Sequence, residues 1–414
     1  MEIWLLQTGE KLPLQSEVRL MRTGLLAEEI RRRGHKLIWW ASSFDHYSKS
    51  WIANGDTSIT LNNGTQLRLL AGIGYKKNIS IRRFVDHFFV AKKFMAEANK
   101  MPKPDIIIAA LPDYRIAYKA YMYAKKNNIP FVLDLRDRWP WDFLSFFPRY
   151  FKWVARLVLF RDFKMATELI KNTDALVTMM KSWVAWACMP PICRKDDAIK
   201  NKVFYLGANN LRGDPLHVKP QILNLIEKIK EKWVVLFIGA FNNSYWPKIA
   251  IEAATEIAKI DDKKGEKDIV FILAGDGDWM EELKVMSAVV PNVYLTGYVN
   301  NEEIYALLKI AKVGLITANG CFEAVPNKLF TYMSGGVPIL SSLVGETNQL
   351  IDKEKIGINY CGLSELVNAI EMLNSDDDLH REMAGNAQEL FDSEYESSKL
   401  YGHYVDYVEK IVSR

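Results

Sequence analysis

The sequence predicts an α/β protein of two domains, each built on a parallel sheet that helices cover. With 414 residues the chain is too long for one ordinary core, and two domains of about 200 residues fit better. The order strand, helix, strand at the start indicates a βαβ unit, and a second series of such units begins at Trp233. Hydrophobic residues make up 49% and charged residues 25% of the chain, which is typical of a soluble globular protein.

The first series opens with an apolar strand over Ile3–Leu6. The helix that follows ends at Gly34, a residue suited to the position after a helix, and Leu37–Trp40 begins the next strand. The apolar stripe of this helix comprises Leu20, Leu25, Leu26 and Ile30. The other elements expected here are strands over Ile106–Ala110, Phe131–Leu135 and Ala175–Met179 and a helix over Ile116–Lys126.

The second series is separated from the first by Asn209–Pro220, which carries Gly213, Pro215 and Pro220. We therefore expect domains over residues 1–208 and 209–394. The strands expected in the second are Val234–Ile238, Ile269–Leu273, Val293–Leu295, Val313–Ile316 and Pro338–Leu340, and the helices are Ile249–Ile260, Glu302–Ala311 and Lys328–Met333.

Bulk properties argue against several classes of protein. A net charge of +4 gives no reason to expect nucleic acid. Four cysteines (Cys188, Cys193, Cys321, Cys361) are too few for a disulfide framework, and reduced cysteines are a better interpretation of the Cys188–Cys193 pair than a metal site. The N-terminus lacks a basic region ahead of its apolar residues, and no uncharged apolar run approaches the roughly 20 residues of a spanning helix. The protein is expected to stay on the side of the membrane where it is made.

The stretch from Gly320 to Pro338 is the most informative about chemistry. Asn327 can open a helix whose first turn bears Lys328, and an ammonium beside the free N–H groups of a helix N-terminus suits a diphosphate. Glu323 precedes the helix, where a carboxylate can accept hydrogen bonds from sugar hydroxyls. An ordinary surface lysine at a helix start is the alternative for Lys328.

This stretch resembles the donor-binding motif of family 4 retaining glycosyltransferases, which have the GT-B fold of two Rossmann-like domains facing across a cleft. The family motif has two glutamates separated by seven residues, and one branch, found in surface-polysaccharide assembly, reads Pro-Asn-Lys-Leu-Phe-Glu-Tyr. The resemblance implies that Glu323 contacts the donor sugar and that Lys328 serves the diphosphate. Thr331 stands where the family has its second glutamate, which holds the ribose hydroxyls.

The resemblance covers nearly the whole chain. It implies that the last helix, within 395–414, packs back on the first domain, and that His35 of Arg33-Gly34-His35 is structural. The arginine that many members carry after the first strand of the second domain is absent from Phe241–Lys248. The other donor-binding residues that it implies are Gly9, Glu10, Gly239, Gly275, Tyr298, Val299, Asn327 and Leu329.

Asp134–Pro140 follows a predicted strand and resembles the family's Asp-x-Arg-Asp-x-Trp-Pro signature. Ligands gather at the carboxyl ends of strands in such sheets, and carboxylates there can position an acceptor hydroxyl and share its proton. We favour Asp137 over Asp134 as the catalytic carboxylate, because Asp134 is still in strand register. An Asp–Arg pair that braces the loop is the alternative.

Two segments predict contact with a membrane surface. The first, Ile81–Phe94, has a helical stripe of apolar residues with basic residues beside it, as interfacial helices do. The stripe comprises Ile81, Phe84, Val85, Phe88 and Phe89, and the basic residues are Arg82, Arg83, Lys92 and Lys93. The second, Trp141–Arg161, interleaves aromatic and basic residues. Either stripe could be a core face instead, and no RNA-binding pattern accompanies them.

These features predict a retaining glycosyltransferase of the hexosyltransferase type. It would move a sugar from a nucleotide-sugar, expected to be UDP-linked, to a polyprenyl-diphosphate saccharide in surface-polysaccharide or O-antigen assembly. No cofactor or metal is expected, because Lys328 and helix dipoles can offset the leaving diphosphate's charge. The expected location is the cytoplasm, peripheral on the inner face of the plasma membrane and bound to anionic lipid. A non-catalytic GT-B subunit that supports a partner enzyme is the alternative, with hydrolase or epimerase activity a distant third.

Overall fold

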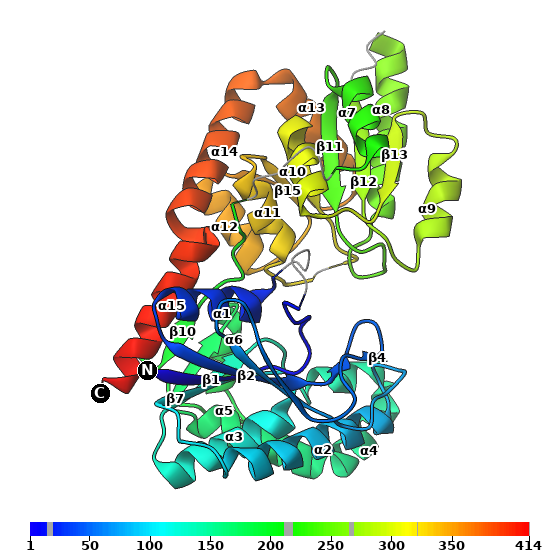
Figure 1. Cartoon of the computed structure of the whole chain (residues 1–414). Helices are drawn as coiled ribbons and strands as arrows, with labels where there is room; N and C mark the ends of the chain where they lie inside the picture. Colours follow the sequence, from blue (N-terminus) through cyan, green and yellow to red (C-terminus); the bar gives the residue numbers. More distant parts are fainter. Residues whose placement is uncertain (15–19, 211–217, 265–268, 321, 414) are drawn as a thin grey trace. The chain divides into compact units, whose positions relative to one another are not determined.

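The computed structural model describes residues 1–14, 20–210, 218–264, 269–320 and 322–413. The chain divides into two compact units, Met1–Tyr205 with Tyr401–Arg414 and Leu206–Leu400. Each unit is a largely parallel sheet with helices packed on it (Figure 1). The predicted α/β class is therefore confirmed. Gly213 and Pro215, on which the predicted domain break depends, lie outside the described residues.

The sheet of unit 1 has the strand order β10-β9-β8-β7-β1-β2-β6-β5. All neighbours pair in parallel except β5 and β6, which are antiparallel. A short antiparallel hairpin, β3 with β4, follows β2. The strands are β1 (Glu2–Leu6), β2 (Lys36–Ser42), β3 (Phe44–Asp45), β4 (Ser50–Trp51), β5 (Thr57–Thr60), β6 (Gln66–Leu70), β7 (Ile106–Ala110), β8 (Phe131–Leu135), β9 (Ala175–Thr178) and β10 (Asn201–Val203).

The helices of unit 1 follow the amphipathic pattern of the sequence. Figure 1 shows α2 and α3 on one face of the sheet and α1 on the other. Phe94 of α2 packs edge-on against Trp4 of β1 and Trp40 of β2, and all three are fully buried. The helices are α1 (Arg22–Arg32), α2 (Ile81–Ala98), α3 (Tyr114–Asn127), α4 (Lys152–Val158), α5 (Phe160–Asn172), α6 (Lys181–Cys188) and the later part of α15 (Ser397–Val412).

The segment Trp141–Arg161, which was predicted to contact a membrane surface, is not one continuous helix. It forms 3₁₀ turns over Asp142–Phe146 and Arg149–Phe151, then α4 and the start of α5. Pro148 lies between the two turns, where it lacks the N–H that a continuous helix would need. The aromatic residues therefore spread over several short elements.

Unit 2 is a parallel sheet with the strand order β13-β12-β11-β14-β15-β16. Its strands are β11 (Trp233–Ile238), β12 (Ile269–Ala274), β13 (Val293–Gly297), β14 (Ala311–Ile316), β15 (Ile339–Ser341) and β16 (Gly357–Asn359). Its helices are α7 (Pro220–Ile229), α8 (Lys248–Lys264), α9 (Met280–Ser287), α10 (Asn301–Ile310), α11 (Asn327–Ser334), α12 (Glu346–Glu354), α13 (Leu363–Ser375) and α14 (Asp377–Leu390), with a π-helical turn over Phe391–Tyr395.

Helix α11 lies unusually close to the sheet of unit 2. The Tyr332 hydroxyl accepts a hydrogen bond from the Ile238 N–H at 2.9 Å and lies 3.1 Å from the Leu236 carbonyl oxygen. A Cβ on Gly314 of β14 would stand 2.4 Å from the Tyr332 ring, so a glycine there permits the close approach. Tyr332 therefore fixes α11 so that Lys328, one turn earlier, lies at the carboxyl edge of the sheet.

Within the described ranges, no helix combines the length and the apolar character that crossing a membrane requires.

Candidate functional site

The loops that follow β11 and β12 interlock at the carboxyl edge of the unit 2 sheet. The Gly239 N–H donates to the Ala274 carbonyl at 3.0 Å, and the Gly275 N–H donates to the Gly297 carbonyl at 2.9 Å. A Cβ on Gly275 would stand 1.8 Å from the Gly239 carbonyl oxygen, so any larger residue would push the loops apart. Gly239 and Gly275, both predicted to bind the donor, therefore form one rigid rim.

Lys328 projects from the first turn of α11 onto this rim. A Cβ on Gly239 would lie 3.0 Å from the Lys328 Nζ, which shows how near the amine comes to the loop. The Nζ also lies 4.4 Å from the ring centroid of Phe237 and 4.2 Å from that of Tyr245. The Lys328 side chain is only 7% exposed, and in the described part of the chain its amine has no hydrogen-bond partner.

The electrostatics of this site favour an anion. Burial lowers the pKa of Lys328 from its usual value to about 7, because no charge among the described residues offsets the lost hydration. The residue before the helix, Pro326, has no side-chain group to cap the first-turn N–H groups. A buried amine without a partner is costly in stability and is typical of functional sites. The site is therefore suited to a ligand such as a diphosphate, which would supply the missing negative charge.

Glu323 lies in the loop that leads into α11, and its side chain is exposed. The loop is held by a parallel bridge to Val344 and by the Thr347 hydroxyl, which donates to the Ala324 carbonyl at 2.5 Å. A Cβ on Gly345 would lie 2.6 Å from a Glu323 carboxylate oxygen, and Gly345 has a φ of 75°. A glycine is therefore required here for two reasons: a side chain would collide with the Glu323 carboxylate, and the positive φ is strained for other residues.

The remaining predicted donor residues differ in what their side chains can reach. Asn327 and Tyr298 are exposed, whereas Leu329 and Val299 are buried and can offer only backbone groups to a ligand. Thr331 is 3% exposed, and its hydroxyl lies 3.2 Å from the Asn327 carbonyl oxygen, in its own helix. A bond from Thr331 to a ribose would compete with that internal contact.

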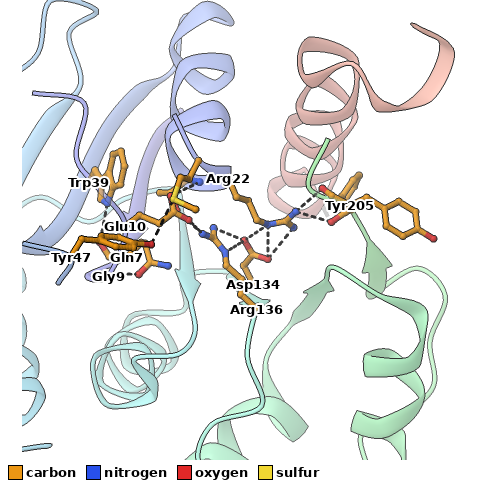
Figure 2. Close-up of polar contacts among 12 residues, drawn as sticks. Gln7, Gly9, Glu10, Arg22, Trp39, Tyr47, Asp134, Arg136 and Tyr205 are labelled. Carbon is orange, nitrogen blue, oxygen red and sulfur yellow. Dashed lines mark hydrogen bonds and ion pairs between the residues drawn. The ribbon is translucent and has the colours of Figure 1, made fainter. Parts of the chain in front are cut away.

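In unit 1, Glu10 belongs to a buried chain of ion pairs (Figure 2). Arg136 pairs with both Glu10 and Asp134, the latter at 2.7 Å. Asp134 also pairs with Arg22 at 3.0 Å, and Arg22 donates to the Tyr205 carbonyl at 2.8 Å. Burial alone would raise the pKa of Asp134, but the two arginines hold it below its usual value. Asp134 therefore braces the loop, which fits the choice of Asp137 as the candidate catalytic carboxylate.

The same chain of ion pairs restrains the loop after β1. A Glu10 carboxylate oxygen accepts the Thr23 N–H at 2.9 Å, near the start of α1. The Gly9 N–H donates to the Gln7 side-chain oxygen at 2.8 Å. Gly9 and Glu10, both predicted donor-binding residues, thus lie in a tightly bonded turn at the carboxyl edge of the sheet.

Asp137 lies three residues beyond Asp134, past the end of β8. Burial raises the pKa of Asp137 to about 6, the nearby Asp142 adds to the rise, and Arg136 and Arg83 oppose it. This carboxyl group therefore exchanges its proton near neutral pH, which suits a residue that shares a proton with an acceptor hydroxyl.

Several polar residues at this edge of unit 1 were missed by the sequence reasoning. Tyr75 and the His46 Nδ1 are hydrogen-bonded at 2.7 Å, and the Thr8 hydroxyl donates to Asp113 at 3.1 Å. His87 lies 3.4 Å from the same Asp113 carboxylate. The residues missed are Tyr75, His87 and Asp113. Tyr75 and Asp113 each come after the end of a strand, which is the signal that could have found them.

Most apolar residues of the predicted stripe, in the first half of α2, are exposed, whereas Val90 and Phe94 in its second half are buried. Ile81 is 84% and Phe88 53% exposed, and Val85 and Phe89 are also exposed. Phe84 differs, because it is partly buried against the core and packs on Phe143 with ring centroids 5.5 Å apart.

Three of the four basic residues predicted to face lipid have partners inside unit 1. Arg82 donates to the Gly74 carbonyl at 2.7 Å, and Lys93 pairs with Asp56 at 2.8 Å. Arg83 donates to the Asn78 carbonyl at 2.9 Å. Lys92 is exposed.

His35, which was predicted to be structural, contacts the last helix. The His35 Nε2 lies 2.7 Å from Glu409 of α15. Among the described residues, Cys188, Cys193 and Cys361 form no disulfide and no cluster of three possible metal ligands occurs. Cys321 lies outside the described residues.

Comparisons with known proteins identify the fold. Residues 232–376 match the family described as "Glycosyl transferases group 1". Anabaena HepE in complex with UDP is similar with a TM-score of 0.68 and 14% identity, covering 99% of both chains. Sucrose-phosphate synthase from Thermosynechococcus elongatus gives a TM-score of 0.73 and 13% identity, covering 100% of this chain and 99% of that one.

WaaG, a glycosyltransferase involved in lipopolysaccharide biosynthesis, gives a TM-score of 0.65 and 15% identity, covering 98% of this chain and 99% of that one. No curated protein matches the sequence. The fold is therefore GT-B, as the sequence predicted, and unit 2 contains a segment with the sequence pattern of group 1 glycosyl transferases.

Proposed function

We propose that the protein is a retaining glycosyltransferase that takes its sugar from a nucleotide-sugar donor. The observation that carries this proposal is the buried Lys328 amine, which has no partner among the described residues and lies against the glycine rim of unit 2. A nucleoside diphosphate supplies the anion that this amine lacks. HepE, whose fold is similar, has been crystallised with UDP, and we therefore propose UDP as the nucleotide.

The exposed Glu323 and the proton-sharing Asp137 complete the proposed chemistry. Glu323 would hydrogen-bond the hydroxyls of the donor sugar, and Lys328 would offset the charge that develops on the leaving diphosphate. Asp137 would position the acceptor hydroxyl and take part of its proton. No step in this scheme requires a metal ion or another cofactor.

We further propose that the acceptor is a saccharide carried on a polyprenyl diphosphate, used in surface-polysaccharide or O-antigen assembly. The protein would act at the cytoplasmic face of the plasma membrane, bound to anionic lipid. The exposed apolar residues of α2 and of 146–160 support this location, because contiguous apolar patches on a soluble protein mark contact surfaces. WaaG, a structural neighbour, is itself involved in lipopolysaccharide biosynthesis.

The test is a panel of UDP-, GDP- and dTDP-sugars titrated against the full chain while its melting temperature is followed. A ligand at 100 times its dissociation constant stabilises a protein by about 2.7 kcal/mol, which is readily measured. We expect UDP-sugars to raise the melting temperature and Lys328→Met to abolish most of the rise. If none of the nucleotide-sugars raises the melting temperature at millimolar concentration, the proposal is wrong.

A non-catalytic subunit remains the second candidate, because the hydroxyl of Thr331 bonds its own helix and the loop over Phe241–Lys248 has no arginine. This candidate predicts that the protein binds UDP-sugars but neither transfers nor hydrolyses the sugar when lipid extracts are supplied as acceptors. Release of UDP that depends on such an extract would exclude it.

A further inference from the structure

Two cations of unit 1 converge on the same tyrosine and the same asparagine. The Lys49 Nζ lies 5.1 Å and the Arg83 guanidinium 5.6 Å from the ring centroid of Tyr75. Lys49 donates to the Asn78 side-chain oxygen at 2.5 Å, and Arg83 donates to the Asn78 carbonyl at 2.9 Å. Lys49 comes from the hairpin after β2 and Arg83 from the first turn of α2, so distant segments build the pair.

Within the ranges that the structure describes, neither cation forms an ion pair with a carboxylate. Lys49 also donates to the His46 carbonyl, and Arg83 to the His87 Nε2 at 3.4 Å, and none of these partners is a carboxylate. Burial is the main cause that lowers the pKa of His46 to about 4. Arg83 and Lys49 add to the fall, and Asp45 opposes it. The N-terminus of the 18-residue helix α2 adds positive potential at the same place.

A line of aromatic rings runs from this cation pair to the protein surface. The Arg83 guanidinium lies 5.1 Å from the ring centroid of Trp139, and the Trp139 centroid lies 5.4 Å from that of Phe143. Phe143 in turn contacts Phe146, with centroids 6.2 Å apart, and Phe146 is 60% exposed. Phe143 is itself buried, so these rings form one packed aromatic cluster with the cation pair at one end and the exposed Phe146 at the other.

Phe146 belongs to a larger set of exposed apolar and aromatic residues, which we call the ring surface. Its exposed members are Phe146, Tyr150, Phe151, Trp153, Leu157, Val158 and Phe160. No acidic residue occurs between Asp142 and Asp162, whereas Arg149, Lys152, Arg156 and Arg161 do. A surface that is apolar and basic suits an amphiphile with a negatively charged head.

We propose that Lys49 and Arg83 bind the phosphate groups of an amphiphilic acceptor, and that its hydrocarbon chain lies on the ring surface, beginning at Phe146. This inference rests on the proposed function, because it assigns the residues that would hold the acceptor of that reaction. A lysine supplies a compact positive charge, and an arginine supplies several N–H donors that can bond two phosphate oxygens at once. Both features suit a diphosphate. Asp137 lies two residues before Trp139 in the sequence, so a sugar attached to the bound head group would lie near it.

The probes are farnesyl diphosphate, inorganic pyrophosphate and farnesol, each titrated calorimetrically into the full chain. A Lys328→Met background removes the anion site of unit 2 from the measurement. We expect farnesyl diphosphate to bind at least tenfold more tightly than either pyrophosphate or farnesol. Lys49→Gln and Arg83→Gln should each weaken farnesyl diphosphate at least tenfold, and Arg83→Lys should weaken it less. Lys126→Gln, which removes an exposed charge at the end of α3, is the matched control and should change nothing.

The apolar half of the proposal has its own variant. Phe146→Ser should weaken farnesyl diphosphate several-fold and leave pyrophosphate unchanged, because only the former has a chain. Equal affinities of pyrophosphate and farnesyl diphosphate would mean that the site takes a free phosphate compound and would overturn the lipid assignment. Unchanged affinities in Lys49→Gln and Arg83→Gln, with melting temperatures intact, would overturn the phosphate assignment.

The failure of this inference can be told apart from failure of the proposed function. UDP-sugar binding is measured separately, on Lys49→Gln and Arg83→Gln in the wild-type background, and should match that of the wild-type chain. Loss of farnesyl diphosphate binding with UDP-sugar binding intact is the expected pattern for these variants. Absence of UDP-sugar binding in the wild-type chain itself would refute the donor proposal, whatever the farnesyl diphosphate titrations show.

Discussion

Replacing Lys328 with methionine tests the donor site most directly. Methionine fills about the same space but carries no charge, so the contacts of the side chain with Phe237 and Tyr245 are largely kept. A hydrogen bond that involves a charged group contributes about 1.5–3 kcal/mol, and each 1.4 kcal/mol is a factor of ten. We therefore expect Lys328→Met to weaken UDP binding at least tenfold.

The pH dependence of the same variant gives a second and sharper result. The pKa of Lys328 is about 7 in the free protein, and a bound diphosphate must raise it, so binding takes up a proton above pH 7. The protonated fraction falls from about one half at pH 7 to about one tenth at pH 8, so UDP should bind about fivefold more weakly at pH 8. Below pH 7 this contribution levels off, because the amine is already charged. Lys328→Met should lose the slope above pH 7.

The assay is isothermal titration calorimetry with UDP at pH 7, 8 and 9, in two buffers whose ionisation enthalpies differ. The difference in observed heat between buffers counts the protons taken up by wild-type protein, and the count should approach zero in Lys328→Met. The melting temperature without ligand should rise in the variant. Burying the Lys328 amine lowers its pKa, and this burial destabilises the folded state at neutral pH. A wild-type affinity that is flat from pH 7 to 9, or a variant that binds UDP normally, would refute the reasoning.

The other predictions concern both units. Asp134→Asn should lower the stability of unit 1 by about 3–5 kcal/mol, seen as a lower melting temperature, because two buried arginines lose their counter-charge. The transfer rate of the wild-type protein should fall below pH 6, where the Asp137 carboxyl group becomes protonated. The transfer rate of Asp137→Asn should not show this fall. Thr331→Ala should weaken UDP if the hydroxyl serves the ribose, and unchanged affinity in calorimetry would remove it from the site. Tyr150→Ser combined with Trp153→Ser should weaken flotation with anionic vesicles, and unaltered flotation would contradict membrane contact through the ring surface.

The apolar strands of both sheets could be predicted from the sequence, because a buried parallel strand reads as a continuous apolar run. The predicted bounds of β7 and β8, Ile106–Ala110 and Phe131–Leu135, agree with the structure. The strands β5 and β6 were not predicted, because Thr57–Thr60 and Gln66–Leu70 interrupt their apolar residues with polar ones. β5 is the edge strand of the sheet and pairs antiparallel with β6. Their pairing depends on contacts between segments that no single run of sequence displays.

The candidate site could be predicted only in part, for a similar reason. Lys328 was found from its place at a helix start, but its burial depends on Phe237 and Tyr245, which come from another strand and its loop. An Asp–Arg pair that braces the loop was only an alternative at the sequence level, and one partner of Asp134, Arg22, is 112 residues away in the sequence. Residue type and spacing indicate which group can do chemistry, and only the fold decides which groups are paired.

Two groups of charged residues in this protein differ in their partners. The buried residues with a structural role around Asp134 form ion pairs within the protein, whereas, in the described part of the chain, those that we propose to bind ligands do not. In the chain from Glu10 through Arg136 and Asp134 to Arg22, each buried charge has an opposite charge within hydrogen-bond distance. Lys328 in unit 2 has no such partner among the described residues, although it is comparably buried.

Evolution could remove the cost of an unpaired amine with a single substitution to methionine, and stability alone would favour that change. The presence of the Lys328 amine beside the glycine rim is therefore better explained by an anion that binds from solution than by any contribution to folding. The same argument extends to Lys49 and Arg83, which lie against the same Tyr75 ring and form no ion pair with a carboxylate in the part of the chain that the structure describes. It predicts that binding of an anion at each site raises the melting temperature of the unit that contains it.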